Sequence, residues 1–87
     1  MRRIIELRLA RAEGALVRTL GLIERRGFSV TAVTMRADPA TETVLLRLEV
    51  ASEGRSFDVL LRQILRLIDV RAALLVEAQQ GDARAAC

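Results

Sequence analysis

Gly14 has the clearest potential for binding chemistry in this sequence, because it stands where a β-type segment passes into a helical one. Hydrophobic and polar residues alternate before it, and hydrophobic residues recur at helical spacing after it. The first backbone amides of a helix lack partners within the helix and lie at the positive end of its dipole. A glycine there leaves these amides open to a carboxylate. A strand-to-helix turn also tolerates glycine for purely structural reasons, so Gly14 alone does not decide between the two interpretations.

The residue types that catalysis needs are scarce. The sequence has no histidine and no tyrosine, and its single cysteine is Cys87. Ser29, Ser52 and Ser56 therefore have no histidine that could activate them as nucleophiles. One cysteine also forms neither an internal disulfide nor a paired-cysteine metal site. We expect no catalytic residue, no metal and no cofactor, and the cysteine usage fits a reducing cytoplasm.

The charge distribution argues against nucleic-acid binding. The net charge is +3, from 14 basic and 11 acidic residues, and every basic residue is an arginine. These arginines are spread along the sequence rather than clustered. The two aromatic residues fall outside the expected first and third strands, where bases would stack on a sheet. The charged residues of those strands instead suit cross-strand ion pairs: Glu6, Arg8, Arg47 and Glu49, with Glu77 on the last strand.

Hydrophobic periodicity divides the sequence into six elements. Alternation predicts strands near 5–10, 28–36, 44–50 and 70–78, and helical spacing predicts helices over 15–26 and 57–68. Gly27 is placed to end the first helix, and Ser56 to cap the second. The inward phase of the second strand changes between Val30 and Val33, which predicts a β-bulge or burial on both faces. The helical positions expected to face the core are Leu16, Leu20 and Ile23, then Phe57, Leu60, Leu61, Ile64, Leu65 and Ile68.

The order β-α-β-β-α-β predicts an α+β, ferredoxin-like fold. Its antiparallel sheet has four strands, with the first and third in the centre, and both helices cover one face. We expect one domain over residues 1–78, followed by a flexible C-terminal tail over 79–87. The longest hydrophobic run, 72–76, is far shorter than the roughly 20 residues of a membrane helix, so no membrane contact is expected. The sequence is 52% hydrophobic, an excess that predicts self-association.

Three segments together resemble the ACT domain of acetolactate synthase regulatory (small) subunits. They are Arg2 to Ile5, then Glu13 to Arg18, and then Gly21 to Val30, which includes Arg-Arg-Gly-Phe. Leu67 to Val70 is similar to the segment that precedes the last strand in this family. The resemblance covers about residues 2–77, and the length is similar to that of family members with a single ACT domain.

The resemblance implies a protein without activity of its own. Small subunits of this family bind a catalytic large subunit that depends on thiamine diphosphate and serves branched-chain amino-acid biosynthesis. They raise its activity and often confer feedback inhibition by valine. Their ACT domains form homodimers through the second strand and the first helix, and the effector sits between the first loop of one copy and the second strand of the other.

Carried onto this sequence, the effector-binding positions are Arg11, Gly14, Ala15, Leu16 and Ser29. Gly14 and the two residues after it match the family. The family usually has asparagine or aspartate at the position of Arg11, and asparagine is common at that of Ser29. Arg11 could pair with a carboxylate, but it removes an acceptor for the ammonium group, and an unpaired buried ammonium is costly. These replacements argue against valine feedback.

Two other functions are compatible with the sequence. The first is a free-standing ACT domain that senses an amino acid for another enzyme. The second, which the mixed charges of the sheet make weaker, is a ferredoxin-like RNA-binding module.

Overall fold

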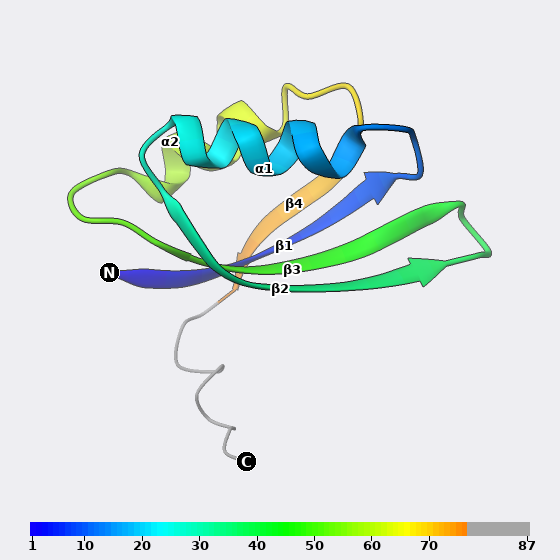
Figure 1. The fold of residues 1–87 in the computed structure, drawn as a ribbon, viewed down its shortest axis with the longest axis horizontal. Helices are drawn as coiled ribbons and strands as arrows, with labels where there is room; N and C mark the ends of the chain where they lie inside the picture. The colour runs from blue at the N-terminus through cyan, green and yellow to red at the C-terminus, as the bar shows by residue number, and fades with distance from the viewer. Residues whose placement is uncertain (77–87) are drawn as a thin grey trace, which may run out of the picture.

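The computed structural model describes residues 1–76, and it contains six elements in the predicted order (Figure 1). They are β1 (Arg2–Ala10), α1 (Ala15–Arg25), β2 (Ser29–Asp38), β3 (Thr43–Ala51), α2 (Phe57–Ile64) and β4 (Val70–Val76). The predicted end of the last strand at 77–78 and the predicted tail over 79–87 lie outside the described residues. No helix within residues 1–76 is both long and apolar enough to cross a bilayer.

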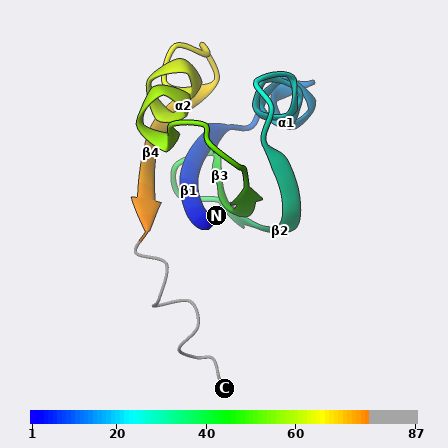
Figure 2. The same ribbon diagram turned by 90° about the vertical axis from the view of Figure 1, so that its left-hand side faces the viewer.

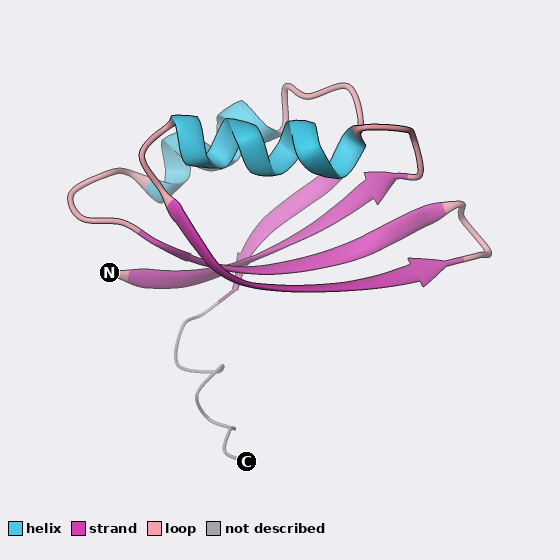
Figure 3. Cartoon of the chain, in the orientation of Figure 1, coloured by secondary structure: helices cyan, strands magenta, loops and turns pink. Residues whose placement is uncertain are grey.

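The four strands form one antiparallel sheet in the order β2-β3-β1-β4. The prediction that the first and third strands are central, with the second and fourth at the edges, is therefore confirmed. Both helices cover one face of the sheet, and the other face has no helix on it (Figure 3). Seen end on, α1 lies on the β2 side and α2 on the β4 side (Figure 2).

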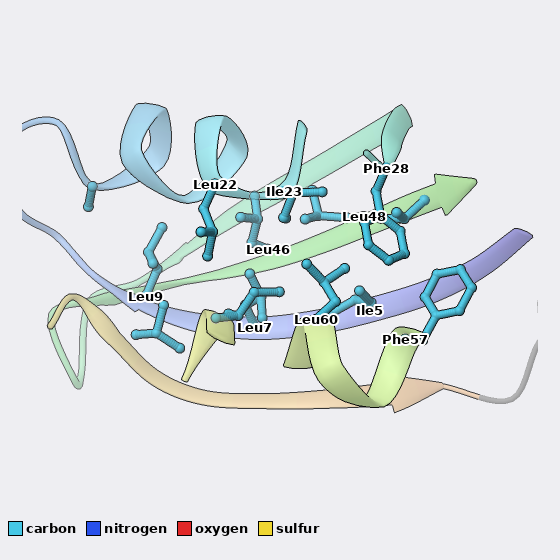
Figure 4. Close-up of a cluster of buried hydrophobic side chains, with 14 residues drawn as sticks. Ile5, Leu7, Leu9, Leu22, Ile23, Phe28, Leu46, Leu48, Phe57 and Leu60 are labelled. Atoms are coloured by element: carbon cyan, nitrogen blue, oxygen red, sulfur yellow. The ribbon is translucent and has the colours of Figure 1, made fainter. Parts of the chain in front are cut away.

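The core fills the space between the sheet and the helices (Figure 4). Alternating residues of β1 and β3 face each other in register, with Ile5 opposite Leu48 and Leu7 opposite Leu46. These four side chains are at most 1% exposed. Because β1 and β3 are central, their helix-facing residues are covered on all sides, which explains why these strands show the cleanest alternation.

The phase change predicted in β2 is a β-bulge. Val30 lies opposite Val50, but the next pair in register joins Ala32 to Glu49, so Thr31 is the extra residue. The bulge returns Val33 and Met35 to the helix-facing side, opposite the buried residues of β3. Sequence alternation alone located this irregularity.

The buried face of α1 is rotated from the one predicted. Its buried residues are Ala15, Thr19, Leu22 and Ile23, whereas Leu16 and Leu20 are only partly buried. Thr19 is fully buried because its hydroxyl donates a hydrogen bond to the carbonyl oxygen of Ala15 at 2.9 Å, which satisfies its one donor. The end of α1 is as predicted, since Gly27 follows it with a φ of 91°.

The second helix is shorter than predicted. Ser56 caps it, and its hydroxyl accepts a hydrogen bond from the amide of Val59 at 3.2 Å. The helix ends at Ile64, after which tighter bonds form between residues three apart. The prediction that Leu65 and Ile68 face the core is wrong, because their exposed fractions are 49% and 85%.

Candidate effector site

The loop between β1 and α1 gives Gly14 a backbone conformation that other residues rarely adopt. Its φ is 80°, in the left-handed region, and it directly precedes α1. The amide of Ala15 donates to the carbonyl of Ala12 at 3.0 Å, which folds the loop tightly beneath the helix. The amide of Arg11 donates to the carbonyl of Glu42 at 3.3 Å, so the loop is also attached to the β2–β3 turn.

The positive end of the α1 dipole is not neutralised by a side chain of the described residues. No side chain caps it, and its first turn contains no acidic residue. Within residues 1–76, the amides of Leu16 and Val17 have no backbone or side-chain acceptor. Two free donors at the positive end of the helix dipole suit a carboxylate, as the position of Gly14 predicted.

A guanidinium group lies beside these amides. A Cβ atom on Gly14 would come within 2.7 Å of Nη1 of Arg18, so the glycine makes room for this side chain. The same guanidinium donates from Nε and Nη2 to Oδ2 of Asp69, at 3.0 and 2.6 Å. The Asp69 side chain is only 11% exposed, and that of Arg18 is 52% exposed. The positive charge of Arg18 therefore lies beside the N-terminal end of α1, and its hydrogen bonds to Asp69 hold it there.

Sequence reasoning missed the Arg18–Asp69 pair. It assigned neither Arg18 nor Asp69 a role in the site. The two residues are 51 positions apart, so no local spacing connects them. A signal did exist, since an aspartate at the edge of a buried strand needs a partner.

The structure brings four of the five predicted effector residues together. Arg11, Gly14, Ala15 and Leu16 lie in one loop and the first helical turn; Ala15 is buried, Leu16 is half-buried, and Arg11 is exposed. Ser29 begins β2, at the other end of α1 (Figure 1). An 11-residue helix is about 16 Å long, too far for one amino acid to reach both ends.

The β2 edge carries exposed hydrophobic side chains. On its helix-facing side, Val33 is 47% exposed and Met35 is 52% exposed. Leu16 and Leu20 are about 160° around α1 from Arg18, which points to Asp69 on the β4 side, so they face the β2 side. An unpaired strand edge beside hydrophobic side chains is a template for pairing with another strand.

The outer face of the sheet carries ion pairs, as predicted, but their partners partly differ. Glu6 pairs with Arg47, its cross-strand neighbour. Arg8 instead bonds to Asp38 of β2 at 3.1 Å, and this hydrogen bond from Arg8 is the main reason that the pKa of Asp38 is lowered. Glu49 lies 3.4 Å from Arg2, which was not among the charged residues expected to form ion pairs.

Two concave surfaces lie among the described residues. A groove of about 370 Å³ runs between the end of α1 and the start of α2 and is lined by arginine, serine, glutamine and hydrophobic residues. A hollow of about 240 Å³ lies on the outer face of the sheet, beside Glu6 and Arg47. Within residues 1–76, no three potential metal ligands of the His, Cys, Asp or Glu type gather.

The sequence profile of the ACT domain matches residues 11–73, and the chain belongs to this family. The acetolactate synthase small subunit of Buchnera aphidicola subsp. Schizaphis graminum is 28% identical over 76 residues, which are 87% of this chain and 48% of that protein. The chain thus spans about half the length of the curated relative it matches. It is an ACT domain protein that resembles acetolactate synthase small subunits.

Solved structures show the same fold. The acetolactate synthase small subunit of Thermotoga maritima superposes with a TM-score of 0.78 at 15% identity, over 90% of this chain and 48% of that one. A formyltetrahydrofolate deformylase of Burkholderia mallei gives 0.68 at 18% identity, over 87% and 28% of the two chains. The C-terminal domain of the MgtC protein of Mycobacterium tuberculosis gives 0.68 at 9% identity, over 86% and 84%. The fold therefore occurs in proteins of different function, and the fold alone does not assign one.

Proposed function

We propose that this chain is a non-catalytic regulatory subunit of acetolactate synthase. It binds and activates the thiamine-diphosphate-dependent catalytic subunit in branched-chain amino-acid biosynthesis, in the cytoplasm. The observation that carries this proposal is the 28% identity to a small subunit over 87% of the chain. The open end of α1, with its neighbouring guanidinium, supports a regulatory role because it suits a carboxylate ligand.

The proposed subunit is a homodimer joined through β2 and the adjacent flank of α1. Antiparallel pairing of β2 with its copy would satisfy the free backbone groups of both edges and extend the sheet to eight strands. It would also cover Val33 and Met35, which are about half exposed in the single chain. In this dimer, the second copy covers both the free backbone groups and the exposed hydrophobic side chains of the β2 edge.

Such a dimer would complete the effector site. In one chain, Ser29 begins β2 and Gly14 lies beyond its far end, next to the β2–β3 turn. A two-fold axis that pairs β2 antiparallel to itself brings Ser29 of a second copy to the end where Gly14 lies. The five predicted residues then form one site from two chains, with Gly14 and Leu16 from one copy and Ser29 from the other.

Activation of the catalytic subunit tests the proposed function. Adding this chain to the cognate catalytic subunit is expected to raise the rate of acetolactate formation, and the two proteins are expected to elute together in size-exclusion chromatography. Unchanged activity together with separate elution contradicts the proposal. Amino-acid binding without association would favour a free-standing sensor for another enzyme.

Valine is expected to bind poorly to the wild-type protein. Arg11 stands where the family has a side chain that accepts a hydrogen bond from the ammonium group, and Ser29 stands where the family commonly has asparagine. An ammonium group that is buried without a partner costs on the order of several kcal/mol. Calorimetric titration of the wild type with valine is expected to give no saturable heat. The double variant Arg11→Asn/Ser29→Asn is expected to gain binding. Leucine and isoleucine serve as comparison ligands, and saturable valine binding by the wild type would refute this expectation.

A further inference from the structure

The turn after α2 exposes hydrophobic side chains among arginines. Leu65 is 49% exposed and Ile68 is 85% exposed, although both belong to the hydrophobic pattern of the helix. Three exposed arginines flank them in sequence, and we name these five residues the α2-end patch: Arg62, Leu65, Arg66, Ile68 and Arg71. The turn stands farther from the sheet than the rest of the helical layer (Figures 1 and 2).

The turn holds a defined conformation despite its exposure. The amide of Ala10 donates to the carbonyl of Asp69 at 2.8 Å, and the Asp69 carboxylate is bound by Arg18. Nη1 of Arg71 donates to the carbonyl of Ile68 at 3.1 Å, which places the Arg71 guanidinium against the turn. The backbone at Ile68 and Asp69 is therefore held by these polar contacts, so the exposure of Ile68 does not come from a loose end.

The charge of the patch is not balanced within the described residues. The ion pairs of residues 1–76 involve Arg2, Arg8, Arg18 and Arg47, and none involves an arginine of the patch. Asp69 adjoins the patch but is committed to Arg18. The patch thus combines two exposed hydrophobic residues with three arginines that form no ion pair within residues 1–76. This composition suits a hydrophobic surface flanked by carboxylates.

This charge decides what can cover the patch. Two copies that met patch to patch would bring six arginines together, and this repulsion opposes a symmetric contact. The β2 edge, where a second copy fits, lies on the opposite side of the sheet from β4 and α2 (Figure 2). The patch therefore stays uncovered in the proposed dimer and is free for a different protein.

We propose that the α2-end patch docks onto an acidic-rimmed hydrophobic surface of another protein, with Ile68 inserted at the centre. This inference rests on the proposed function and names the surface by which the subunit meets its partner, the catalytic subunit of acetolactate synthase. Arg62, Arg66 and Arg71 pair with carboxylates at the rim and set the orientation. A dimer built through β2 carries two such patches and binds two catalytic subunits.

Exposed substitutions test the patch without disturbing the fold. The variants Ile68→Ser and Arg66→Glu, alone and together, are compared with Arg55→Glu, which makes the same charge change just before α2, at the opposite end of that helix. Binding to the catalytic subunit is measured by biolayer interferometry at two salt concentrations, and sedimentation velocity checks the oligomer. We expect Ile68→Ser/Arg66→Glu to weaken binding by about tenfold or more, with folding and oligomeric state unchanged and Arg55→Glu binding like the wild type.

The outcomes separate the two proposals. If the double variant binds and activates as well as the wild type, the patch proposal is wrong and the regulatory function stands. If Arg55→Glu weakens binding equally, the contact is a diffuse effect of charge, and the patch proposal is also wrong. If the double variant loses self-association, the patch serves a second copy and not a different protein. If the wild-type protein does not bind the catalytic subunit, both proposals are overturned.

Discussion

Replacing Met35 by glutamate is expected to convert the protein from a dimer to a monomer. Met35 lies on the helix-facing side of β2 and is 52% exposed in the single chain. In the proposed dimer this side chain is covered by the second copy, so a carboxylate there would be buried without a partner, twice per dimer. A cost of about 3 kcal/mol corresponds to a dissociation constant weakened by about a hundredfold.

The neighbouring residue supplies the matched control. Thr34 is the preceding residue of β2 and lies opposite Arg47 of β3 on the outer face of the sheet. Thr34→Glu therefore introduces the same charge at the same strand edge, but on the face that points to solvent. Sedimentation equilibrium over a range of concentrations is expected to show a dimer for the wild type and for Thr34→Glu, and a monomer for Met35→Glu. A wild-type protein that stays monomeric at high micromolar concentration would refute the dimer, as would a Met35→Glu variant that dimerises normally.

The sheet could be predicted because its information is local. Hydrophobic and polar residues alternate along most of β1 and β3, because each of these central strands has one face against the helices and one against solvent. The bulge in β2 was also visible, because a single extra residue shifts every later side chain to the other face. Turn chemistry and the glycines at both ends of α1 set the boundaries between elements.

The helices were predicted less well, because tertiary contacts decide which face of each helix is buried. The pattern of α1 favoured Leu16 and Leu20, but the helix buries Ala15 and Thr19 instead. A small residue and a back-bonded threonine let the helix approach the sheet closely, while the leucines turn to the β2 edge. Likewise, the pattern of α2 continued past Ile64 although the chain must turn to start β4.

The candidate site divides in the same way. Gly14 and the first turn of α1 were predicted from adjacent residues, and the structure places Gly14 directly before the helix. Arg18 and Asp69 were not, because their contact joins distant segments of the chain. Ser29 was carried over from the family resemblance, and a single chain does not bring it to the loop. Its place in the site depends on a second copy.

Replacing Arg18 by methionine is expected to destabilise the fold. Methionine keeps the aliphatic stem but removes both hydrogen bonds to Asp69, and leaves a carboxylate that is 11% exposed without a partner among residues 1–76. Because the Arg18 side chain is itself 52% exposed, water screens part of the interaction. We expect the free energy of unfolding in urea to fall by about 1–3 kcal/mol.

A double-mutant cycle separates the ion pair from other effects of Arg18. Asp69→Asn removes the charge and keeps an oxygen acceptor, so it should cost less than Arg18→Met. Combined with Arg18→Met, it should add little, because the charge that needed a partner is gone. Additive losses would show that the two side chains act independently, which would contradict the role assigned to the pair.

The Arg18–Asp69 pair also limits which residues can replace Gly14. Gly14→Ala forces a side chain into a left-handed conformation and places its Cβ 2.7 Å from Nη1 of Arg18. The first cost is independent of Arg18, and the second disappears when Arg18 is shortened. Gly14→Ala should therefore destabilise the wild type more than it destabilises Arg18→Met. Equal losses in both backgrounds would mean that the guanidinium moves aside freely, and that the glycine is required only for the backbone turn at the head of α1.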